Sequence, residues 1–285
     1  MLAGLALLVA KWVAKRGRVP VIITTGLALL VVIPIVLSRR IEALNFVEPI
    51  ATLTAGRREF VILAFAGTLL LLTPVTLLPR RNERRLIQLL SVVAVFYFSI
   101  LPFLQPAIAK HKLEEIGMVL DDDNVCLQSY HYTCGPAAAV TALRLLKIDA
   151  HEGELAIAAH TSPIVGTAPD SLAFAIEEKF AGLGIQAKYR WFQSLDDIDP
   201  KTITLAIIQQ GALIDHYVAV VYIDGRIVRF ADPINGYREL SRGTFKQIWR
   251  GSGVVITRSR RPIQVWKKAW ALPEQVSEWL NSWND

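Results

Sequence analysis

Three long apolar stretches constrain the fold of this chain most, because about 20 apolar residues can cross a lipid bilayer as a helix. They cover residues 19–38, 60–79 and 86–109, contain 20, 20 and 24 residues, and carry no charged side chain. Their internal prolines, which membrane helices tolerate because neighbouring helices satisfy the freed backbone groups, are Pro34, Pro74 and Pro102. We therefore expect three transmembrane helices in the first half of the chain.

A fourth apolar stretch, residues 1–10, is shorter and ends at Lys11. It has neither the basic start nor the small-residue cleavage site of a signal peptide. Two structures remain open for it: a helix lying in the membrane interface, or a short first span with Lys11 reaching back to the headgroups. We expect three to four transmembrane helices in a multi-pass region, residues 1–112.

The basic charge of the chain belongs to this membrane region. Residues 1–112 contain 14 Lys/Arg and 4 Asp/Glu, whereas residues 113–285 contain 17 and 21, so the two balances are +10 and −4. Basic residues that flank apolar helices meet anionic lipid headgroups. The lipid bilayer is therefore an expected partner, and binding to nucleic acid is disfavoured because the second half is mildly acidic.

The distribution of basic residues between the two membrane sides is nearly even. One side carries eight: Lys11, Lys15, Arg16, Arg18, Arg80, Arg81, Arg84 and Arg85. The other side carries six: Arg39, Arg40, Arg57, Arg58, Lys110 and Lys112. The positive-inside tendency favours placing the second half outside the cytoplasm, by a margin of two residues.

The second half places a cysteine at the start of a helix. Residues 137–147 are rich in helix formers with apolar side chains at 3–4 spacing, and Gly135-Pro136 before them fits a helix start. Cys134 then lies at the helix N-terminus, which favours the thiolate. Gln128, six residues upstream, is a plausible donor to an oxyanion.

A hairpin supplies a base and an acid for this thiol. His216 opens the apolar run 217–223, an Asp-Gly turn follows at Asp224, and a second strand over 226–231 ends at Asp232. His216 and Asp232 stand eight residues before and eight residues after Asp224, so cross-strand pairing brings them close. A carboxylate beside an imidazole fixes its tautomer and stabilises the imidazolium.

The other elements follow in α+β order, helices first and an antiparallel sheet afterwards. The pattern predicts helices over 152–159, 169–180 and 244–249, and strands over 185–191, 202–209 and 254–257. Residues 110–123 are expected to be a solvated linker between the halves.

These motifs resemble the C39 peptidases, a family of papain-like cysteine proteases known best as leader-cleaving domains of bacteriocin-exporting ABC transporters. The motifs are Gln-x5-Cys-Gly-Pro-Ala from Gln128, Gly-Thr from Gly166 before a helical run, His-Tyr-Val-Ala-Val from His216 and Asp-Pro-x2-Gly from Asp232. Four motifs in this order are far more specific than a lone Cys-Gly-Pro. The resemblance covers roughly residues 121–258.

The resemblance implies a role for each matching residue. Cys134 would be the nucleophile, His216 the general base and acid, Asp232 the orienting acid and Gln128 the oxyanion donor. It also implies an α+β papain-like peptidase domain, residues 113–258, followed by a basic, Trp-rich tail, residues 259–285. The expected activity is that of a membrane-anchored thiol endopeptidase, a hydrolase of peptides or precursor proteins, some with a Gly-Gly leader.

Location and partners follow from the same resemblance. A multi-pass protein of a bacterial inner (plasma) membrane is expected. The side of the catalytic domain stays open, since C39 domains attached to exporters work in the cytoplasm. The chain lacks a Gly-x4-Gly-Lys-[Ser/Thr] phosphate loop, so any ABC exporter would be a separate partner. Two alternatives are kept: a silent domain that binds leader peptides for a transporter, and a papain-like acyltransferase or transglutaminase.

No cofactor or metal is expected. The two cysteines are not arranged as paired ligands, and no His-Glu-x-x-His pattern occurs. Cys126 is interpreted as structural, because a bridge to Cys134 would block the nucleophile. In the tail, Trp266, Trp270, Trp279 and Trp283 occur in pairs at helical spacing, which suits either a membrane interface or packing on the peptidase domain.

Overall fold

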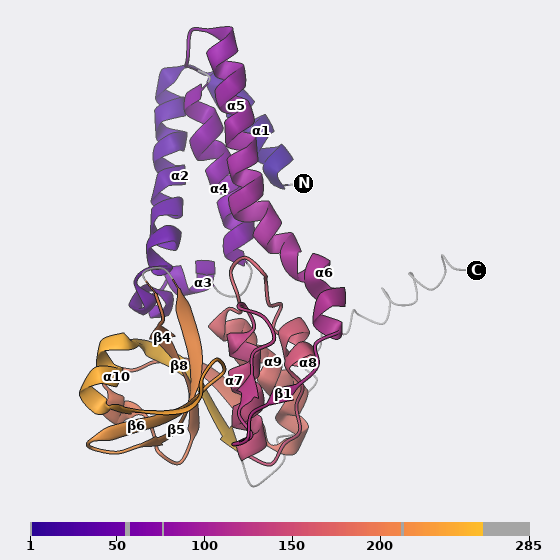
Figure 1. Ribbon diagram of the computed structural model, residues 1–285. Helices are drawn as coiled ribbons and strands as arrows, with labels where there is room; N and C mark the ends of the chain where they lie inside the picture. Colours follow the sequence, from indigo (N-terminus) through magenta and orange to yellow (C-terminus); the bar gives the residue numbers. More distant parts are fainter. Residues whose placement is uncertain (1, 55–57, 76, 212–213, 259–285) are drawn as a thin grey trace, which may run out of the picture.

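The computed structural model describes residues 2–54, 58–75, 77–211 and 214–258. A helical part, within residues 2–114, stands on an α+β part, residues 119–258, and helix α6 leads from one to the other (Figure 1). The Trp-rich tail expected over residues 259–285 lies outside the described residues.

The helical part contains six α-helices and two shorter segments among the described residues. They are α1 (Leu2–Ala14), α2 (Arg18–Ser38), η1 (Glu42–Phe46), α3 (Ile50–Thr54), α4 (Arg58–Val75), α5 (Arg81–Val95), the π-helical η2 (Phe96–Ile100) and α6 (Leu101–Glu114). Because η2 joins α5 to α6, the third apolar stretch lies within one continuous helical run.

Three of these helices are long and apolar enough to cross a membrane, as expected: α2, α4 and the run Arg81–Glu114. This run extends beyond the predicted 86–109 at both ends, because polar helix formers such as Arg, Glu and Lys continue it. Its last residues therefore belong to a helix and not to the solvated linker predicted from residue 110.

Helix α1 packs one face against the bundle. The buried residues Ala6 and Ala10 contact Ala28 of α2 and Leu69 of α4, and small side chains of this kind allow helices to approach closely. With 13 residues, α1 rises only about 20 Å, against a bilayer core of about 30 Å. It thus supports α2 and α4 by packing against them. It is too short to cross a bilayer if it stands along the bilayer normal.

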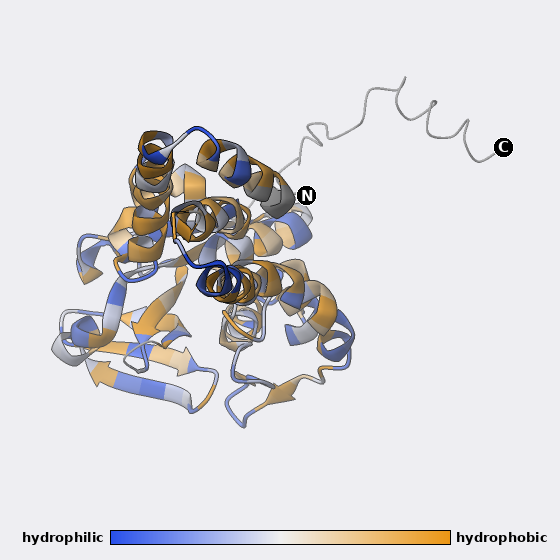
Figure 2. Cartoon of the chain, turned by 90° about the horizontal axis from the view of Figure 1, so that it is seen from above, coloured by the Kyte–Doolittle hydropathy of each residue, from blue (hydrophilic) through white to orange (hydrophobic). Residues whose placement is uncertain are grey.

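The outward faces of the bundle are apolar. In the view along the bundle, its helices are coloured hydrophobic around most of their circumference (Figure 2). On α2, for example, Leu27 and Leu30 expose 61% and 70% of their surface. A helix that is apolar on all sides is typical of a membrane span.

Among its described residues, the α+β part contains a small hairpin, four α-helices, two short 3₁₀ helices and a six-stranded antiparallel sheet. Its elements are β1 (Val119–Leu120), β2 (Cys126–Leu127), α7 (Cys134–Leu145), α8 (Glu152–Ala158), α9 (Pro169–Phe180), η3 (Ala181–Leu183), β3 (Ile185–Trp191), η4 (Leu195–Asp197), β4 (Ile203–Gln209), β5 (Asp215–Ile223), β6 (Ile227–Asp232), β7 (Gly236–Ser241), α10 (Arg242–Ile248) and β8 (Trp249–Arg258). The strand order is β3-β8-β4-β5-β6-β7. The α+β class expected from the sequence is confirmed.

Both faces of the central strands are buried, which explains why β5 reads as an unbroken apolar run. Tyr217 and Ala219 point into the core formed with α7 and α9, whereas Val218 and Val220 point into a second core that α10 covers with Phe245. Helices thus cover one face of the sheet, and η4 and α10 close the other.

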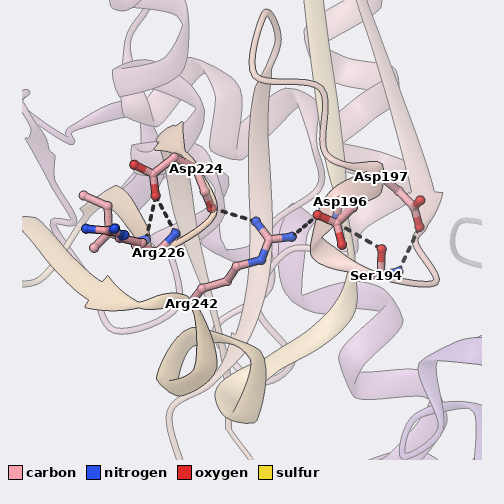
Figure 3. A network of polar contacts seen from close by, with 7 residues as sticks. Ser194, Asp196, Asp197, Asp224, Arg226 and Arg242 are labelled. Carbon is pink, nitrogen blue, oxygen red and sulfur yellow. Dashed lines mark hydrogen bonds and ion pairs between the residues drawn. The ribbon is translucent and has the colours of Figure 1, made fainter.

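A polar network ties the β5–β6 turn to this second layer (Figure 3). Arg242 donates to the backbone oxygen of Asp224 at 2.8 Å and to Asp196 at 2.6 Å. The Asp224 carboxylate in turn accepts the N–H of Arg226 at 2.7 Å. These bonds stabilise the turn whose strands carry His216 and Asp232.

Candidate active site

Cys134 is the first residue of α7, and 9% of its surface is exposed. No side chain caps this helix, because the Thr133 hydroxyl is engaged with the N–H and the oxygen of Tyr130 at 3.1 and 2.9 Å. The first N–H groups of a helix have no intrahelical acceptor. They are therefore available to a negative charge that develops beside the Cys134 sulfur.

Gly135 lets the start of α7 lie directly against β5. A Cβ atom here would stand 3.3 Å from each of the side chains of Leu172, Thr167 and Tyr217. The Tyr217 hydroxyl also donates to the Thr167 oxygen at 3.0 Å, which fixes the Gly-Thr loop against the same helix end. The sequence Cys-Gly thus brings the thiol close to the strand that carries His216.

His216 lies at the start of β5 and is 3% exposed. Its Nε2 is 2.8 Å from Oδ1 of Asp232, and the nearby Cys134 side chain also contributes to raising the pKa of the ring. Since Asp232 holds Nε2, Nδ1 is the nitrogen left for the thiol. The ring therefore bonds the carboxylate on one side, and the three residues expected to act together lie near one another.

The register of the hairpin differs from the one predicted. Ala219 pairs with Ala231, so Asp232 lies beside Val218 and not directly opposite His216. The difference arises because the turn and a bulge between Val220 and Tyr222 shift the count. A shift of two residues keeps side chains on the same face, so His216 and Asp232 still meet diagonally across the hairpin.

Asp232 is held as a carboxylate. Burial alone would raise its pKa, but hydrogen bonds from His216, Asn235 and the N–H of Ile234 lower it to about 2. The Asn235 amide donates to Oδ2 at 2.9 Å, and the Ile234 N–H donates to Oδ1 at 2.9 Å. Asn235 was not singled out in the sequence, although it lies within the Asp-Pro-x2-Gly motif.

The pKa of the His216 side chain is raised. Burial lowers its pKa, but the hydrogen bonds and charges of Asp232 and Cys134 outweigh burial and raise the pKa to about 9. The imidazolium is thus stable at neutral pH beside the Asp232 carboxylate. A thiolate–imidazolium pair is the form in which cysteine acts as a nucleophile.

Gln128 lies in the loop that leads to Cys134. Its backbone N–H donates to the oxygen of Pro233 at 2.8 Å, which places it next to Asp232 in space. Its side-chain Oε1 is buried and has no hydrogen-bond partner among the described residues. The unpartnered atom is the acceptor oxygen of the amide, whereas the predicted oxyanion donor is its N–H group, so the role of Gln128 stays a prediction.

A buried glutamate holds the same loop. Glu152 opens α8, is 1% exposed, and accepts the N–H of Ser129 at 2.9 Å and its hydroxyl at 2.7 Å. Sequence reasoning missed this residue, because a glutamate in the first turn of a helix is most simply explained by the helix dipole. The bond to Ser129 fixes the residue that follows Gln128.

The second cysteine lies in a different environment. Cys126 is fully buried, and burial together with the charge of Glu152 raises its pKa to about 12. Cys126 and Cys134 are both free thiols. The interpretation of Cys126 as a structural residue agrees with this burial. Among the described residues, no three His, Cys, Asp or Glu side chains converge as metal ligands.

A thiol at a helix N-terminus, near an imidazole that a buried carboxylate orients, is the arrangement that thiol-dependent hydrolases and acyltransferases use. The model of the Peptidase C39 family matches residues 122–262, which include all of these groups. The chain belongs to the peptidase C39 family.

Relatives and solved structures match the same region. An uncharacterized protein of Methanothermobacter marburgensis is 32% identical over 139 residues, which are 49% of this chain and 92% of that protein. Another from Methanothermobacter thermautotrophicus is 30% identical over the same shares. The peptidase domain of Streptococcus ComA, a bifunctional ABC transporter of a quorum-sensing pathway, is 17% identical with a TM-score of 0.40, covering 47% of this chain and 96% of that one. A double glycine motif protease of an AMS/PCAT transporter, solved with the leader peptide, is 14% identical with a TM-score of 0.38, covering 50% and 93%.

Proposed function

We propose that this chain is a membrane-anchored cysteine endopeptidase. The observation that carries the proposal is the buried imidazole of His216, which lies 2.8 Å from the Asp232 carboxylate and has its pKa raised by both Asp232 and Cys134. Membership of the C39 family supports a peptidase. The three helices able to cross a membrane support the anchoring.

The proposed reaction has two steps. The Cys134 thiolate attacks the carbonyl carbon of a peptide bond, and His216 gives its proton from Nδ1 to the leaving amine, so that a thioester remains. Water then gives a proton to His216 and attacks the thioester, which releases the acid and restores the thiol–imidazole pair. Asp232 keeps the ring oriented during both steps.

The oxyanion of each tetrahedral intermediate needs donors. The N–H of Cys134 at the uncapped start of α7 and the side-chain N–H of Gln128 are the groups that we assign to it. The substrate is proposed to be a peptide or precursor protein, including precursors with a Gly-Gly leader, and a separate ABC exporter is a proposed partner.

Cleavage can be tested with the full chain purified in detergent. Incubation with a library of peptides, including Gly-Gly leaders, followed by mass spectrometry should reveal cut products, and Cys134→Ala should reduce them below detection. Cys126→Ala is the matched control and should cut normally, because Cys126 is buried away from the triad. Equal cutting by Cys134→Ala and the native chain would refute the proposal.

The same experiment separates the rival activities. In water enriched in heavy oxygen, hydrolysis places one heavy atom in the new carboxyl group, whereas an acyltransferase would transfer the acyl group to an added amine. A silent binding domain would retain leader peptides on a column without producing fragments. Either of the last two results would replace the peptidase assignment.

A further inference from the structure

A cavity of about 570 Å³ lies between the helical part and the α+β part, and Cys134 forms part of its lining. On the side of the α+β part it is lined also by the loop before α9 and by β4 and β5. Its other walls come from all three candidate spans and from the segments between them: Ser38, Arg39, Glu42, Asn45, Ala51, Thr54, Glu59, Phe60, Pro102 and Pro106. Cys134 therefore lies on the wall of a cavity that the α+β part shares with the membrane region.

The membrane wall of this cavity is fixed to the sheet at one end by η1. The Glu42 carboxylate accepts hydrogen bonds from the hydroxyls of Tyr189 on β3 and Ser252 on β8, the latter at 3.2 Å. Phe46 packs its ring 4.7 Å from that of Tyr189 and 6.1 Å from that of Trp191. The segment after α2 is thus docked on the edge of the sheet.

A second contact fixes the wall through α6. Near its end, Leu113 and Ala109 pack with Tyr132 and Ala156 in one buried cluster. The backbone of α6 approaches α8 so closely that a Cβ on Gly153 would stand 2.3 Å from the Leu113 oxygen. The helical part thus contacts the α+β part at two places, through η1 and through the end of α6.

The loop that faces these spans carries exposed apolar side chains. Ile164 and Val165 line the cavity and still expose 45% and 48% of their surface. They follow Ser162, whose N–H and oxygen pair with Gly166 at the base of the loop. An apolar loop tip beside membrane helices suits a position at the bilayer surface.

From this shared cavity we infer that the substrate is itself anchored in the membrane, as a peptide whose scissile bond lies within a few residues of the bilayer surface. The inference rests on the proposed peptidase function and names its substrate class. A peptide whose own apolar segment lies beside the spans would extend its first polar residues into a cavity that the spans line. A soluble peptide would not need a cavity that residues of all three spans line.

The test uses the full chain in phosphatidylethanolamine–phosphatidylglycerol vesicles and two peptides with one cleavage sequence, taken from the peptide screen. One peptide carries a transmembrane anchor and the other does not. We expect kcat/KM at least about tenfold higher for the anchored peptide, because anchoring raises its effective concentration. Lengthening the spacer from about 5 to about 20 residues, up to about 50 Å of extra chain, should remove the gain. Equal rates for both peptides, or no dependence on the spacer, would overturn the inference.

A variant of the membrane wall gives a second readout. Ala51→Trp fills the cavity from α3 and should lower cleavage of the anchored peptide by about tenfold or more, since a single misplaced contact can reduce rates that far. Ala107→Trp is the control, because Ala107 is exposed on α6 and does not line the cavity. Unchanged cleavage by Ala51→Trp would count against the cavity as the substrate route.

Labelling of Cys134 separates failure of this inference from failure of the proposed function. A charged, soluble thiol reagent and the same reagent on an acyl chain are compared for their labelling rates in vesicles. Faster labelling by the anchored reagent together with no cleavage of any peptide would refute peptidase activity and retain access from the membrane. Faster labelling by the soluble reagent would refute access from the membrane even if peptides are cut.

Discussion

Asp232 sets the charge state of the imidazole next to it, since its hydrogen bond and its charge both raise the pKa of His216. Asp232→Asn removes that charge and the ring orientation that accompanies it. We expect kcat for peptide cleavage to fall roughly 10²–10⁴-fold. Asn235→Ala, which removes one of the donors to Asp232, should have a smaller effect in the same assay; a larger effect than that of Asp232→Asn would contradict this ranking.

Peptide cleavage should become slower at alkaline pH. The pKa of His216 is raised to about 9, so cleavage should decline as pH rises through that value, because the proton for the leaving amine is lost. In Asp232→Asn the decline should begin at lower pH. Profiles of kcat/KM against pH for both proteins check this, and an identical alkaline limb would show that Asp232 does not set the pKa.

The stability of the folded protein should also depend on pH through His216 and Asp232. The folded pKa of His216 lies above its ordinary 6.5, so its contribution is complete below pH 6.5 and is lost as pH rises through about 9. The folded pKa of Asp232 lies below its ordinary 3.8, so its contribution is complete above pH 3.8 and is lost as pH falls through about 2. Unfolding temperatures measured in detergent should therefore be highest between about pH 4 and 6.5.

At the residue scale, the chemistry of the site could be predicted and its supports could not. Cys134, His216 and Asp232 each stand at a signal that sequence makes visible, namely a helix start and the two ends of a hairpin. The two-residue register error did not matter, because a shift of two preserves the face. Glu152 escaped prediction because its partner Ser129 lies 23 residues away in the chain.

At the scale of the elements, α6 can pack closely on α8 because residue 153 is a glycine. Gly153→Ala would place a Cβ 2.3 Å from the Leu113 oxygen, so backbone must shift. We expect a loss of about 1–3 kcal/mol in the free energy of unfolding, as for other overpacked sites. Gly182→Ala is the matched control, because nothing lies within 4 Å of that position. Equal thermal stability of the two variants would contradict the close approach.

Elements with a strong period were predictable and those without one were not. Helix α9 and strand β3 have the predicted bounds, because a proline marks the start of the helix and alternating apolar residues mark the strand. Strand β7 was missed, since it lies at the sheet edge with most residues exposed and has no apolar run. The hairpin of β1 and β2 is too short to have a periodic signal.

On the scale of the whole molecule, Glu42 is the polar link between its two parts. Burial raises the pKa of Glu42, although the hydrogen bonds from Tyr189 and Ser252 lower it. Glu42→Ala should cost about 1–3 kcal/mol, because buried hydroxyls lose their acceptor. A double-mutant cycle with Tyr189→Phe should give a coupling energy of about 0.5–3 kcal/mol in unfolding measurements, and additive effects would show that the two residues do not interact.

The arrangement of the two parts is what sequence could not supply. The helical part could be predicted from the length of its apolar stretches, and the α+β part from the order of its motifs. The cavity between them depends on Glu42, Phe46 and Gly153, which belong to no motif. The division of the chain at residues 112 and 258 stays a prediction, as does the membrane side of the catalytic part.

The contrast between the two cysteines has a practical consequence for biochemistry. Cys126 is sealed in the core with a pKa of about 12, whereas Cys134 lines the cavity, and the sequence holds only these two. In folded protein, a thiol-reactive electrophile should therefore label Cys134 alone, so that one bound equivalent corresponds to one competent site. Turnover can be expressed per functional molecule, so that preparations in different lipids share a common standard before any natural substrate is known.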